Sequence, residues 1–403
     1  EEAKDLANTL KSGKMPAPAR IIQEDVVGPS LGKEAIRSGL WSFAIGFVLI
    51  LLYMIFYYGL IPGLIADAAL LCNVFLLVGI LSSFSAVLTL PGIAGIVLTM
   101  GCAVDGNVLI YERIREELRA GKNMRKAIED GFKGAISAIV DANVTSLLTG
   151  IILAVFGTGP IKGFAVTYII GIISSFMTAV FITRLLLEDY AKREDAKELP
   201  FTSMITKNWF QNMHFDFVSA RKWAYPVAGV LIIFAILGLD PHIFGKLNLG
   251  IDFSGGRNYV VRFDKPVNTQ DVEHSLLAVF NEQNQEGENL TVRVITFGES
   301  NDQVRISTNF RIHDNSETLD DEIEQLIYNG TKQFFASDLT FDEFQSTQVN
   351  ENVGIMQSQK VGPAIADDIT TSAVWAVIAA LIVIFLYILI RFRNFAYSVG
   401  AVA

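Results

Sequence analysis

The chain has 403 residues, of which 51% are hydrophobic and only 18% are charged, and its mean hydropathy is +0.40. Soluble domains carry about 25% charged residues, and the apolar residues here gather in runs of about twenty, enough to cross a hydrocarbon core of roughly 30 Å. A soluble globular protein is therefore excluded, and the net charge of −10 argues against a nucleic-acid-binding protein. Cys72 and Cys102 both lie in apolar runs, where they are expected to be small packing residues rather than a disulfide.

The segment that leads into the first apolar run has some features of a phosphate-binding loop. It reads "VGPSLGK" from Val27 to Lys33, but only three residues separate Gly28 from Gly32, where such a loop has four. Glu34 stands where the loop needs a hydroxyl, and the preceding "ARIIQEDV" is a poor candidate for a buried strand. The sequence therefore predicts no nucleotide binding at this point.

Seven apolar runs predict membrane-spanning helices, at about 39–58, 62–83, 90–112, 134–156, 161–185, 223–240 and 373–391. Short loops rich in Lys and Arg stay in the cytoplasm. Basic residues follow the third, fifth and seventh runs, namely Arg113, Arg115, Arg119, Lys122, Arg125, Lys126, Lys133, Arg184, Lys192, Arg193, Lys197, Arg391 and Arg393. The turns at 85–91 and 157–163 carry only Lys162, so we expect both turns outside the cytoplasm.

This map predicts a polytopic α-helical membrane protein with one separate outer domain. The expected regions are 1–38, the end of an outer domain and a lead-in segment; 39–185, a five-helix membrane domain; 186–222, a cytoplasmic linker; 223–240, one helix; 241–372, the outer domain; and 373–403, a further helix and the start of the next segment.

The lead-in segment occurs twice. Five residues recur at one offset (361 − 27 = 334): Val27, Gly28, Pro29, Ser38 and Trp41 match Val361, Gly362, Pro363, Ser372 and Trp375. The lysine is not repeated. Such a parallel internal repeat is typical of transporters. Because glycine gives conformational freedom and proline fixes the chain direction, we expect Gly28 with Pro29, and Gly362 with Pro363, to be hinges at the outer membrane face.

The sequence of the outer domain predicts an α+β, ferredoxin-like fold with the element order β-α-β-β-α-β. "RNYVVRF", "LTVRVITF", "DQVRIST" and "DEFQSTQVN" are expected strands, with helices opening near Asn268 and Thr318. In "GIDFSGG" the residues Asp252, Gly255 and Gly256 are expected to shape a tight backbone turn, because glycine allows unusual backbone angles. Ser254 of the same segment has no nucleophile-elbow context, so it is not a candidate catalytic nucleophile. The sequence holds no nucleophile–base pair and no metal-ligand cluster, so neither an enzyme nor a metal site is expected.

Three aspartates lie inside predicted spans, where a carboxylate costs roughly 2.5–3.5 kcal/mol. Asp67 lies a few residues from the inner face, and a position near the helix end or in a wet, hydrogen-bonded niche explains it best. Asp141, beside Asn143 and Thr145, fits a structural or a functional role equally. Asp105 is deeper, among Gly101, Cys102, Gly106 and Asn107, and small neighbours let it face a bundle interior. A carboxylate there can bind and release a proton, so these three residues are the proton-relay candidates.

Long motifs resemble one family. "AVDGNVLIYERIREELRAGKNMRKAIEDGFKGAISAIVDANVTSLLTG" is similar to the membrane half of SecD, while "LNLGIDFSGGRNYVV" and "QKVGPAIADDITTSAVW" resemble the first part of SecF. Joined in one chain they look like a SecDF fusion. The resemblance implies that most of the large SecD outer domain precedes this segment and that further SecF helices, with their own aspartate and arginine, follow Ala403. It also implies that Asp105 matches the family's membrane aspartate in "VDANVLIFERI", with Gly106 in place of alanine.

The SecD/SecF family is related to RND-type transporters, so the resemblance implies an RND-like helix bundle. It further implies a multi-pass protein of the bacterial inner membrane with a periplasmic domain, driven by the proton gradient without another cofactor. The implied partners are the SecYEG channel, SecA, a YajC-like subunit, unfolded preproteins and membrane lipid. The alternative that the helix plan leaves open is an RND-type exporter of lipids or small hydrophobic molecules.

Overall fold

The computed structural model describes residues 23–84, 88–193, 198–203, 205–206, 216–239, 250–283, 290–298, 301–314, 316, 318–336, 338–346 and 353–402. The predicted outer-domain remnant before residue 23 lies outside them. The chain divides into two compact units. The sheet domain comprises Glu1–Glu34 and Asn248–Thr370, and the helix domain comprises Ala35–Leu247 and Thr371–Ala403.

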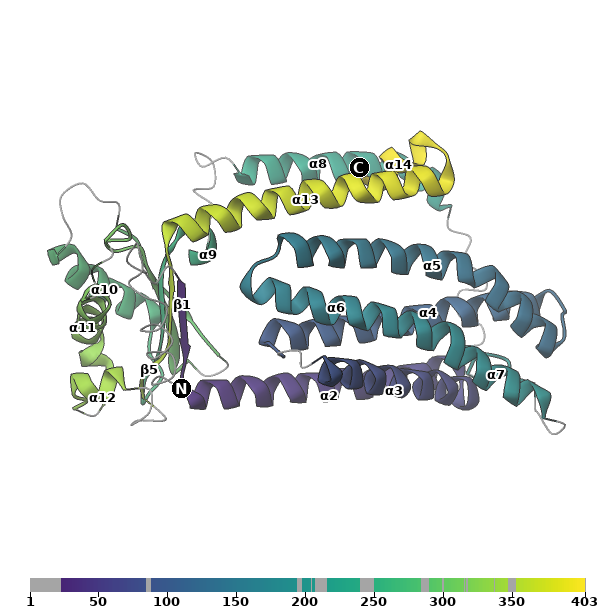
Figure 1. The fold of residues 1–403 in the computed structure, drawn as a ribbon, viewed down its shortest axis with the longest axis horizontal. Helices are drawn as coiled ribbons and strands as arrows, with labels where there is room; N and C mark the ends of the chain where they lie inside the picture. The colour runs from purple at the N-terminus through teal and green to yellow at the C-terminus, as the bar shows by residue number, and fades with distance from the viewer. Residues whose placement is uncertain are drawn as a thin grey trace, which may run out of the picture. The chain divides into compact units, whose positions relative to one another are not determined.

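The helix domain contains the predicted spans (Figure 1). Its elements are α2 (Pro29–Tyr58), α3 (Leu60–Ser83), α4 (Leu90–Arg119), α5 (Met124–Phe156), α6 (Gly159–Met177), the π-helix η1 (Thr178–Ile182), α7 (Thr183–Lys192), α8 (Phe217–Leu239), α13 (Pro363–Phe392) and α14 (Phe395–Val402), of which α2 and α13 begin in the sheet domain. Six segments of the described chain are long and apolar enough to span a membrane: Leu31–Tyr58, Leu60–Ser83, Leu90–Arg119, Met124–Phe156, Ile161–Lys192 and Pro363–Phe392. The seventh predicted span, 223–240, lies on α8, which is a helix but is not among these six.

Local sequence explains where these helices begin and how closely they pack. Thr89 caps α4 by accepting a hydrogen bond from the Gly92 amide at 3.1 Å, and Asn123 caps α5 by accepting from Lys126 N at 2.9 Å. Small residues let helix backbones approach one another. A Cβ added at Gly131 of α5, for example, would lie 2.5 Å from the Ile114 side chain of α4. The helices α4, α5 and α6 thus form a closely packed group.

The sheet domain has the predicted order of elements. Its parts are β1 (Gln23–Val27), α9 (Ile251–Ser254), β2 (Gly256–Arg262), α10 (Thr269–Gln283), β3 (Val292–Thr296), β4 (Gln303–Thr308), α11 (Leu319–Thr331), the 3₁₀ turn η2 (Lys332–Phe334), α12 (Phe341–Gln345) and β5 (Gly354–Val361). The antiparallel sheet runs β1-β5-β2-β4-β3. Apolar residues of α10 and α11 pack on the sheet in one core. The β-α-β-β-α-β prediction is therefore confirmed.

The sequence prediction of the last strand is wrong. Part of "DEFQSTQVN" forms the helix α12, because Thr340 and Glu343 build a capping box in which each side chain bonds the other's backbone amide. The last strand is instead β5, "GIMQSQKV", which pairs with β2 on one side and β1 on the other. The capping box favours a helix where the sequence predicted a strand.

The two copies of the internal repeat meet in the sheet. The stretch before Gly28, a poor candidate for a buried strand, forms β1, and all five of its residues are exposed. β1 pairs with β5 antiparallel, with Asp25 opposite Gln359 at the centre of the register. These two residues are separated by the repeat offset (359 − 25 = 334), so equivalent strands are paired about a local two-fold axis.

Candidate proton site and hinge segments

Asp105 lies on α4 and lines a small pocket of about 80 Å³ in the helix domain. The pocket is shared with α5 and α6 through residues that include Ile139, Asn143 and Ile172. The expectation of a bundle-interior position is not met within this chain, because the Asp105 side chain is exposed. Within the described chain Asp105 has no hydrogen-bond or ion-pair partner.

Close packing and a buried polar pair lie directly beside Asp105. A Cβ added at Gly106 would lie 3.0 Å from the Cβ of Ala179 in η1, so glycine here permits close contact between α4 and the π-helix. One turn further, Thr183 Oγ1 donates to Asn107 Oδ1 at 2.7 Å, and both residues are buried. π-Helical turns inside α-helices are frequent at functional sites. The sequence pattern gave no signal for this turn.

Asp141 has a different environment, on a side of α5 that faces α13. Its Oδ1 accepts hydrogen bonds from Tyr387 Oη at 2.7 Å and from Arg391 Nε at 2.7 Å. Arg391 also donates to Ser137 Oγ. Asp141 is therefore ion-paired, and it joins two helices from different halves of the repeat. Tyr387 and Arg391 were missed by the sequence analysis, which assigned Arg391 only to a cytoplasmic positive cluster.

Asp67 is buried in α3, with 5% of its surface exposed, and its Oδ1 has no partner among the described residues. Its electrostatic neighbour is Tyr111, whose hydroxyl donates instead to the Pro62 carbonyl at 2.8 Å. Asp67 has no hydrogen bond among the described residues, so the expected hydrogen-bonded niche is not formed within them. The Asp105 pocket includes neither Asp67 nor Asp141, and no described group of three His, Cys, Asp or Glu residues could hold a metal ion.

The two candidate structural segments of the sheet domain lie together. Gly255 and Gly256 have φ values of 70° and 133°, which side-chain-bearing residues rarely adopt, so the predicted tight turn is present. A Cβ at Gly255 would lie 3.4 Å from the Pro363 Cα, and a Cβ at Gly256 would lie 2.7 Å from the Thr308 carbonyl oxygen. Asp252 is exposed in the first turn of α9. The "GIDFSGG" turn therefore packs against the start of α13.

Each Val-Gly-Pro segment connects a strand directly to a helix. Gly28 follows β1 and its carbonyl accepts from Gly32 N at 3.0 Å, while Gly362 follows β5 and its carbonyl accepts from Ala366 N at 3.1 Å. Pro29 and Pro363 are the first residues of α2 and α13, where a missing amide hydrogen costs nothing. Neither glycine has positive φ. The two copies thus share one local geometry.

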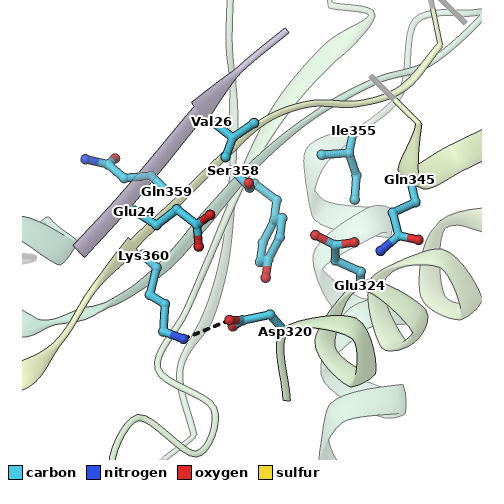
Figure 2. A pocket seen from close by; sticks show the side chains of 10 residues that line it. Glu24, Val26, Asp320, Glu324, Gln345, Ile355, Ser358, Gln359 and Lys360 are labelled. Carbon is cyan, nitrogen blue, oxygen red and sulfur yellow. Dashed lines mark hydrogen bonds and ion pairs between the residues drawn. The ribbon is translucent and has the colours of Figure 1, made fainter. Parts of the chain in front are cut away.

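A second pocket, of about 290 Å³, lies in the sheet domain (Figure 2). Its carboxylates come from Glu24, Asp320 and Glu324, and Asp320 is bound by Lys360 at 2.7 Å and by Arg257 at 2.6 Å. Glu324 lies half-buried, one helical turn after Asp320 on α11, and its Oε2 has no partner among the described residues. No sequence pattern indicates this group, since Glu24 and Lys360 are distant from Asp320 and Glu324 in the chain.

Comparison with known proteins assigns the whole arrangement to one family. The family model "Protein export membrane protein SecD/SecF, C-terminal" matches residues 8–193 and 342–403, and the "SecD/SecF GG Motif" matches residues 243–267. The protein translocase subunit SecD of Calditerrivibrio nitroreducens is 50% identical over 198 residues, which are 49% of this chain and 38% of that protein. SecD of Rhodothermus marinus is 56% identical over 188 residues, 47% of this chain and 30% of that protein.

A solved structure extends the likeness to both halves. The crystal structure of SecDF from Thermus thermophilus, described as a translocon-associated membrane protein, superposes with a TM-score of 0.78 at 32% identity. It covers 99% of this chain, whereas this chain spans 49% of that protein. The helix bundle with its aspartates, the antiparallel sheet domain and the glycine-pair turn all fall within these matches, and the chain belongs to the SecD/SecF family of protein export membrane proteins.

Proposed function

We propose that this chain is part of a proton-driven accessory subunit of the bacterial Sec preprotein translocase. In this proposal the subunit lies in the inner membrane, with its sheet domain on the periplasmic side. It assists SecYEG, SecA and a YajC-like subunit in moving unfolded preproteins across the membrane, and it needs no cofactor beyond the proton gradient. The names of the relatives, which are translocase subunits, support the Sec assignment.

The observation that carries the proton-driven part is the contrast between Asp105 and Asp141. Asp105 lies on a membrane-spanning helix, where it lines a pocket and has no ion-pair partner in the described chain. An unpaired carboxylate in a span can bind and release a proton, and intramembrane ionisable residues commonly serve proton relays. Asp141 is held by Arg391 and Tyr387, which favours a structural role.

The test is Asp105→Asn in the complete protein. This change is nearly isosteric and removes only the titratable group, so the variant is expected to fold and to lose proton-gradient-dependent stimulation of export. One charge moved through 100 mV supplies about 2.3 kcal/mol, which the variant cannot use. The measurement is the export rate of a preprotein in inverted membrane vesicles, with and without a proton gradient.

Asp105→Glu is the matched control, because it keeps a carboxyl group at the same place. It is expected to retain part of the stimulation. Normal stimulation in Asp105→Asn would remove Asp105 from the mechanism. Crosslinking the intact protein in cells separates this function from lipid export, since a captured preprotein supports translocation and a captured lipid alone supports the RND-type exporter.

A further inference from the structure

A pocket of about 470 Å³ opens at the C-terminal end of α4 in the helix domain. It is distinct from the Asp105 pocket, and it contains none of the proton-relay candidates. Three of its residues are cationic and one is acidic, while the others are mainly apolar. The lining residues are Arg115, Leu118, Arg119, Lys122, Met124, Glu198, Leu199, Pro200 and Thr202.

Arg115 is the buried cation of this pocket. Its side chain is only 4% exposed, and it forms an ion pair with Glu112 at 2.6 Å through Nη1. Its Nε is also buried but has no hydrogen-bond partner among the described residues. A buried donor without an acceptor is costly, so the Arg115 guanidinium, which lines the pocket, is not fully satisfied by the described chain.

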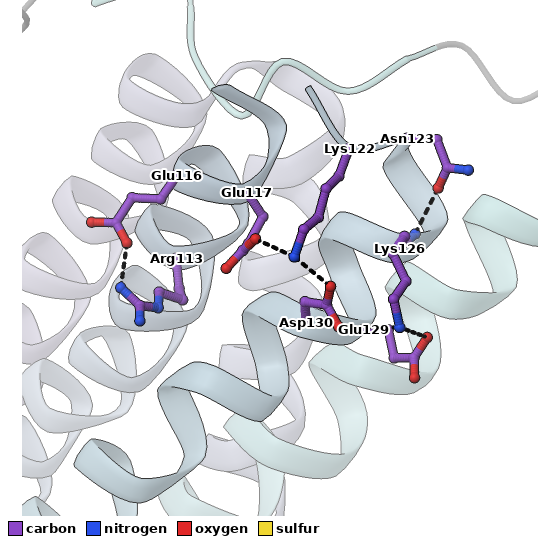
Figure 3. Close-up of polar contacts among 8 residues, drawn as sticks. All are labelled: Arg113, Glu116, Glu117, Lys122, Asn123, Lys126, Glu129 and Asp130. Atoms are coloured by element: carbon purple, nitrogen blue, oxygen red, sulfur yellow. Dashed lines mark hydrogen bonds and ion pairs between the residues drawn. The ribbon is translucent and has the colours of Figure 1, made fainter. Parts of the chain in front are cut away.

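The other two cations differ in how strongly they are already engaged. Lys122 bridges Glu117 of α4 and Asp130 of α5, at 2.6 Å to each (Figure 3). Arg119 is exposed and has no ion pair in the described part of the chain. Arg115 and Arg119 therefore supply the guanidinium donors that remain available. Met124 lies at the start of α5, where the helix dipole adds partial positive charge.

The pocket lies at the depth of lipid head groups. Arg115 is 25 residues after Leu90 (115 − 90), the first residue of α4, which corresponds to about 38 Å along the helix. The hydrocarbon core is about 30 Å thick and the bilayer about 40–45 Å with its polar regions. Tyr57, whose ring centroid lies 5.9 Å from the Arg115 guanidinium, fits this depth, because tyrosine is enriched at the membrane interface.

The far wall of the pocket is firmly attached to the helices. It is formed by residues 198–202, of which Leu199 and Phe201 are buried. Thr206 Oγ1 donates to the Tyr57 carbonyl at 2.7 Å, and the Phe201 ring lies 5.1 Å from the Tyr111 ring. A wall held at these points gives a preformed pocket rather than a loose surface.

We propose that this pocket binds the phosphate of an anionic phospholipid, phosphatidylglycerol in particular. Arg115 and Arg119 donate to the phosphate oxygens, since guanidinium groups match phosphate geometry. Leu118, Met124 and Leu199 contact the apolar part of the lipid, and Glu198 accepts a hydrogen bond from a glycerol hydroxyl. Basic pockets among helices on the cytoplasmic side suit such head groups, and the basic loops predict that this end faces the cytoplasm.

The experiment measures lipid binding to the full chain in detergent by native mass spectrometry. Dioleoyl-phosphatidylglycerol and dioleoyl-phosphatidylcholine are offered at equal concentration. We expect one phosphatidylglycerol per chain, bound at least about tenfold more tightly than phosphatidylcholine. Arg119→Gln and Arg115→Gln should each weaken phosphatidylglycerol binding about tenfold. Arg113→Gln, an exposed arginine of α4 outside the pocket, is the matched control and should leave binding unchanged.

If Arg115→Gln fails to fold, Arg115→Lys takes its place, because it keeps the positive charge. This variant is expected to bind phosphatidylglycerol with intermediate affinity. Equal binding of the two lipids, or equal effects of Arg119→Gln and Arg113→Gln, would overturn the proposal. Displacement of the lipid by inorganic phosphate at the same concentration would assign the pocket to a free anion. Arg119-dependent binding of a poly-glutamate peptide, without Arg119-dependent lipid binding, would assign it to a protein partner. Either result also overturns the lipid assignment.

Discussion

Two carboxylates one helical turn apart on α11 show how local environment sets ionisation. Burial alone would raise the pKa of Asp320, but its ion pairs with Lys360 and Arg257 hold that pKa below its usual range. Burial raises the pKa of Glu324 to about 7, and nearby acidic residues add to the effect. Figure 2 shows the two side chains lining one pocket. The pKa values of two neighbouring acids on one helix are thus shifted in opposite directions.

The stability of the sheet domain is expected to depend on pH through Glu324. Its folded pKa of about 7 exceeds the ordinary value of 4.5, so the folded state holds the proton more tightly. The contribution of Glu324 to stability is then fully present below about pH 4.5 and is lost as the pH rises through 7. Glu324→Gln should remove this loss and stabilise the domain above pH 7 by on the order of 1 kcal/mol after solvent screening.

Hydrogen exchange of the β5 and α11 amides in the whole chain, measured from pH 5 to 8, gives the stability. The values need correction for the intrinsic exchange rate at each pH. Glu322→Gln, an exposed neighbour on the same helix, is the control and should keep the parental pH dependence. A parental profile in Glu324→Gln would show that this carboxylate does not set the stability.

The glycine pair of "GIDFSGG" makes a second residue-scale prediction. Gly256→Val should destabilise the sheet domain by roughly 1–3 kcal/mol, because valine at φ 133° is strained and its Cβ would meet the Thr308 carbonyl. Gly250→Val is the control from the same segment, since Gly250 has φ −68° and no atom within 4 Å of an added Cβ. Thermal unfolding of the purified protein measures both. A contact-site role would appear instead as loss of export at unchanged melting temperature.

At the scale of elements, Asp141 and Arg391 connect α5 to α13. We expect Asp141→Asn and Arg391→Gln each to destabilise the helix domain, because each leaves a charged or polar partner unsatisfied. The double variant should lose less than the sum, with a coupling energy of about 1 kcal/mol. A double-mutant cycle on thermal unfolding measures this. Arg393→Gln, two residues on, is the control, and additive effects would show that the pair contributes no coupling.

The pairing of β1 with β5 is the other element-scale result. β1 is short and exposed, and its residues have little β-strand character by hydrophobic pattern. It forms a strand because β5 offers an unpaired edge and because the repeat places equivalent residues opposite each other. Pairing across 334 positions is a property of tertiary structure, although the repeat that produces it is visible in the sequence.

At the scale of the whole molecule, the chain passes between the two compact units at three points, of which two lie in the helices α2 and α13 and the third lies between Leu247 and Asn248. The units separate between Glu34 and Ala35 and between Thr370 and Thr371, one to two turns after each Val-Gly-Pro segment. In the proposed function the sheet domain acts on a preprotein and moves relative to the membrane helices, and hinges are often a few residues at the ends of elements. The hinge role of Gly28 and Gly362 remains a prediction.

Gly362→Ala tests this role. Alanine fits the observed φ, so the sheet domain should melt as the parent does, while the reduced freedom should slow export severalfold. Gly46→Ala in the middle of α2, where an added Cβ has no neighbour within 4 Å, is the control and should export normally. The measurements are thermal unfolding and export rate. Unimpaired export in Gly362→Ala would place any motion elsewhere along the two helices.

The sequence by itself determined the features that depend on local pattern. Runs of apolar residues identified six of the seven predicted spans, because a bilayer demands continuous hydrophobic length, and period-two and helical spacing predicted most of the sheet domain. The positive φ of Gly255 and Gly256 was predictable, since few other residues allow such a turn. The candidate Asp105 was visible because a carboxylate within an apolar run is costly and needs a reason.

Only the tertiary structure decided which side chains meet. Asp141 and Asp105 look alike in sequence, but one is paired with Arg391 from 250 residues away and the other lines a pocket without a partner. The same holds for Glu324 beside Asp320 and Glu24, and for Arg115 beside residues 198–202. Ionisation and binding depend on distances between residues far apart in the chain. Hydrophobic period and turn chemistry act over a few neighbours, so they carry no information about such distances.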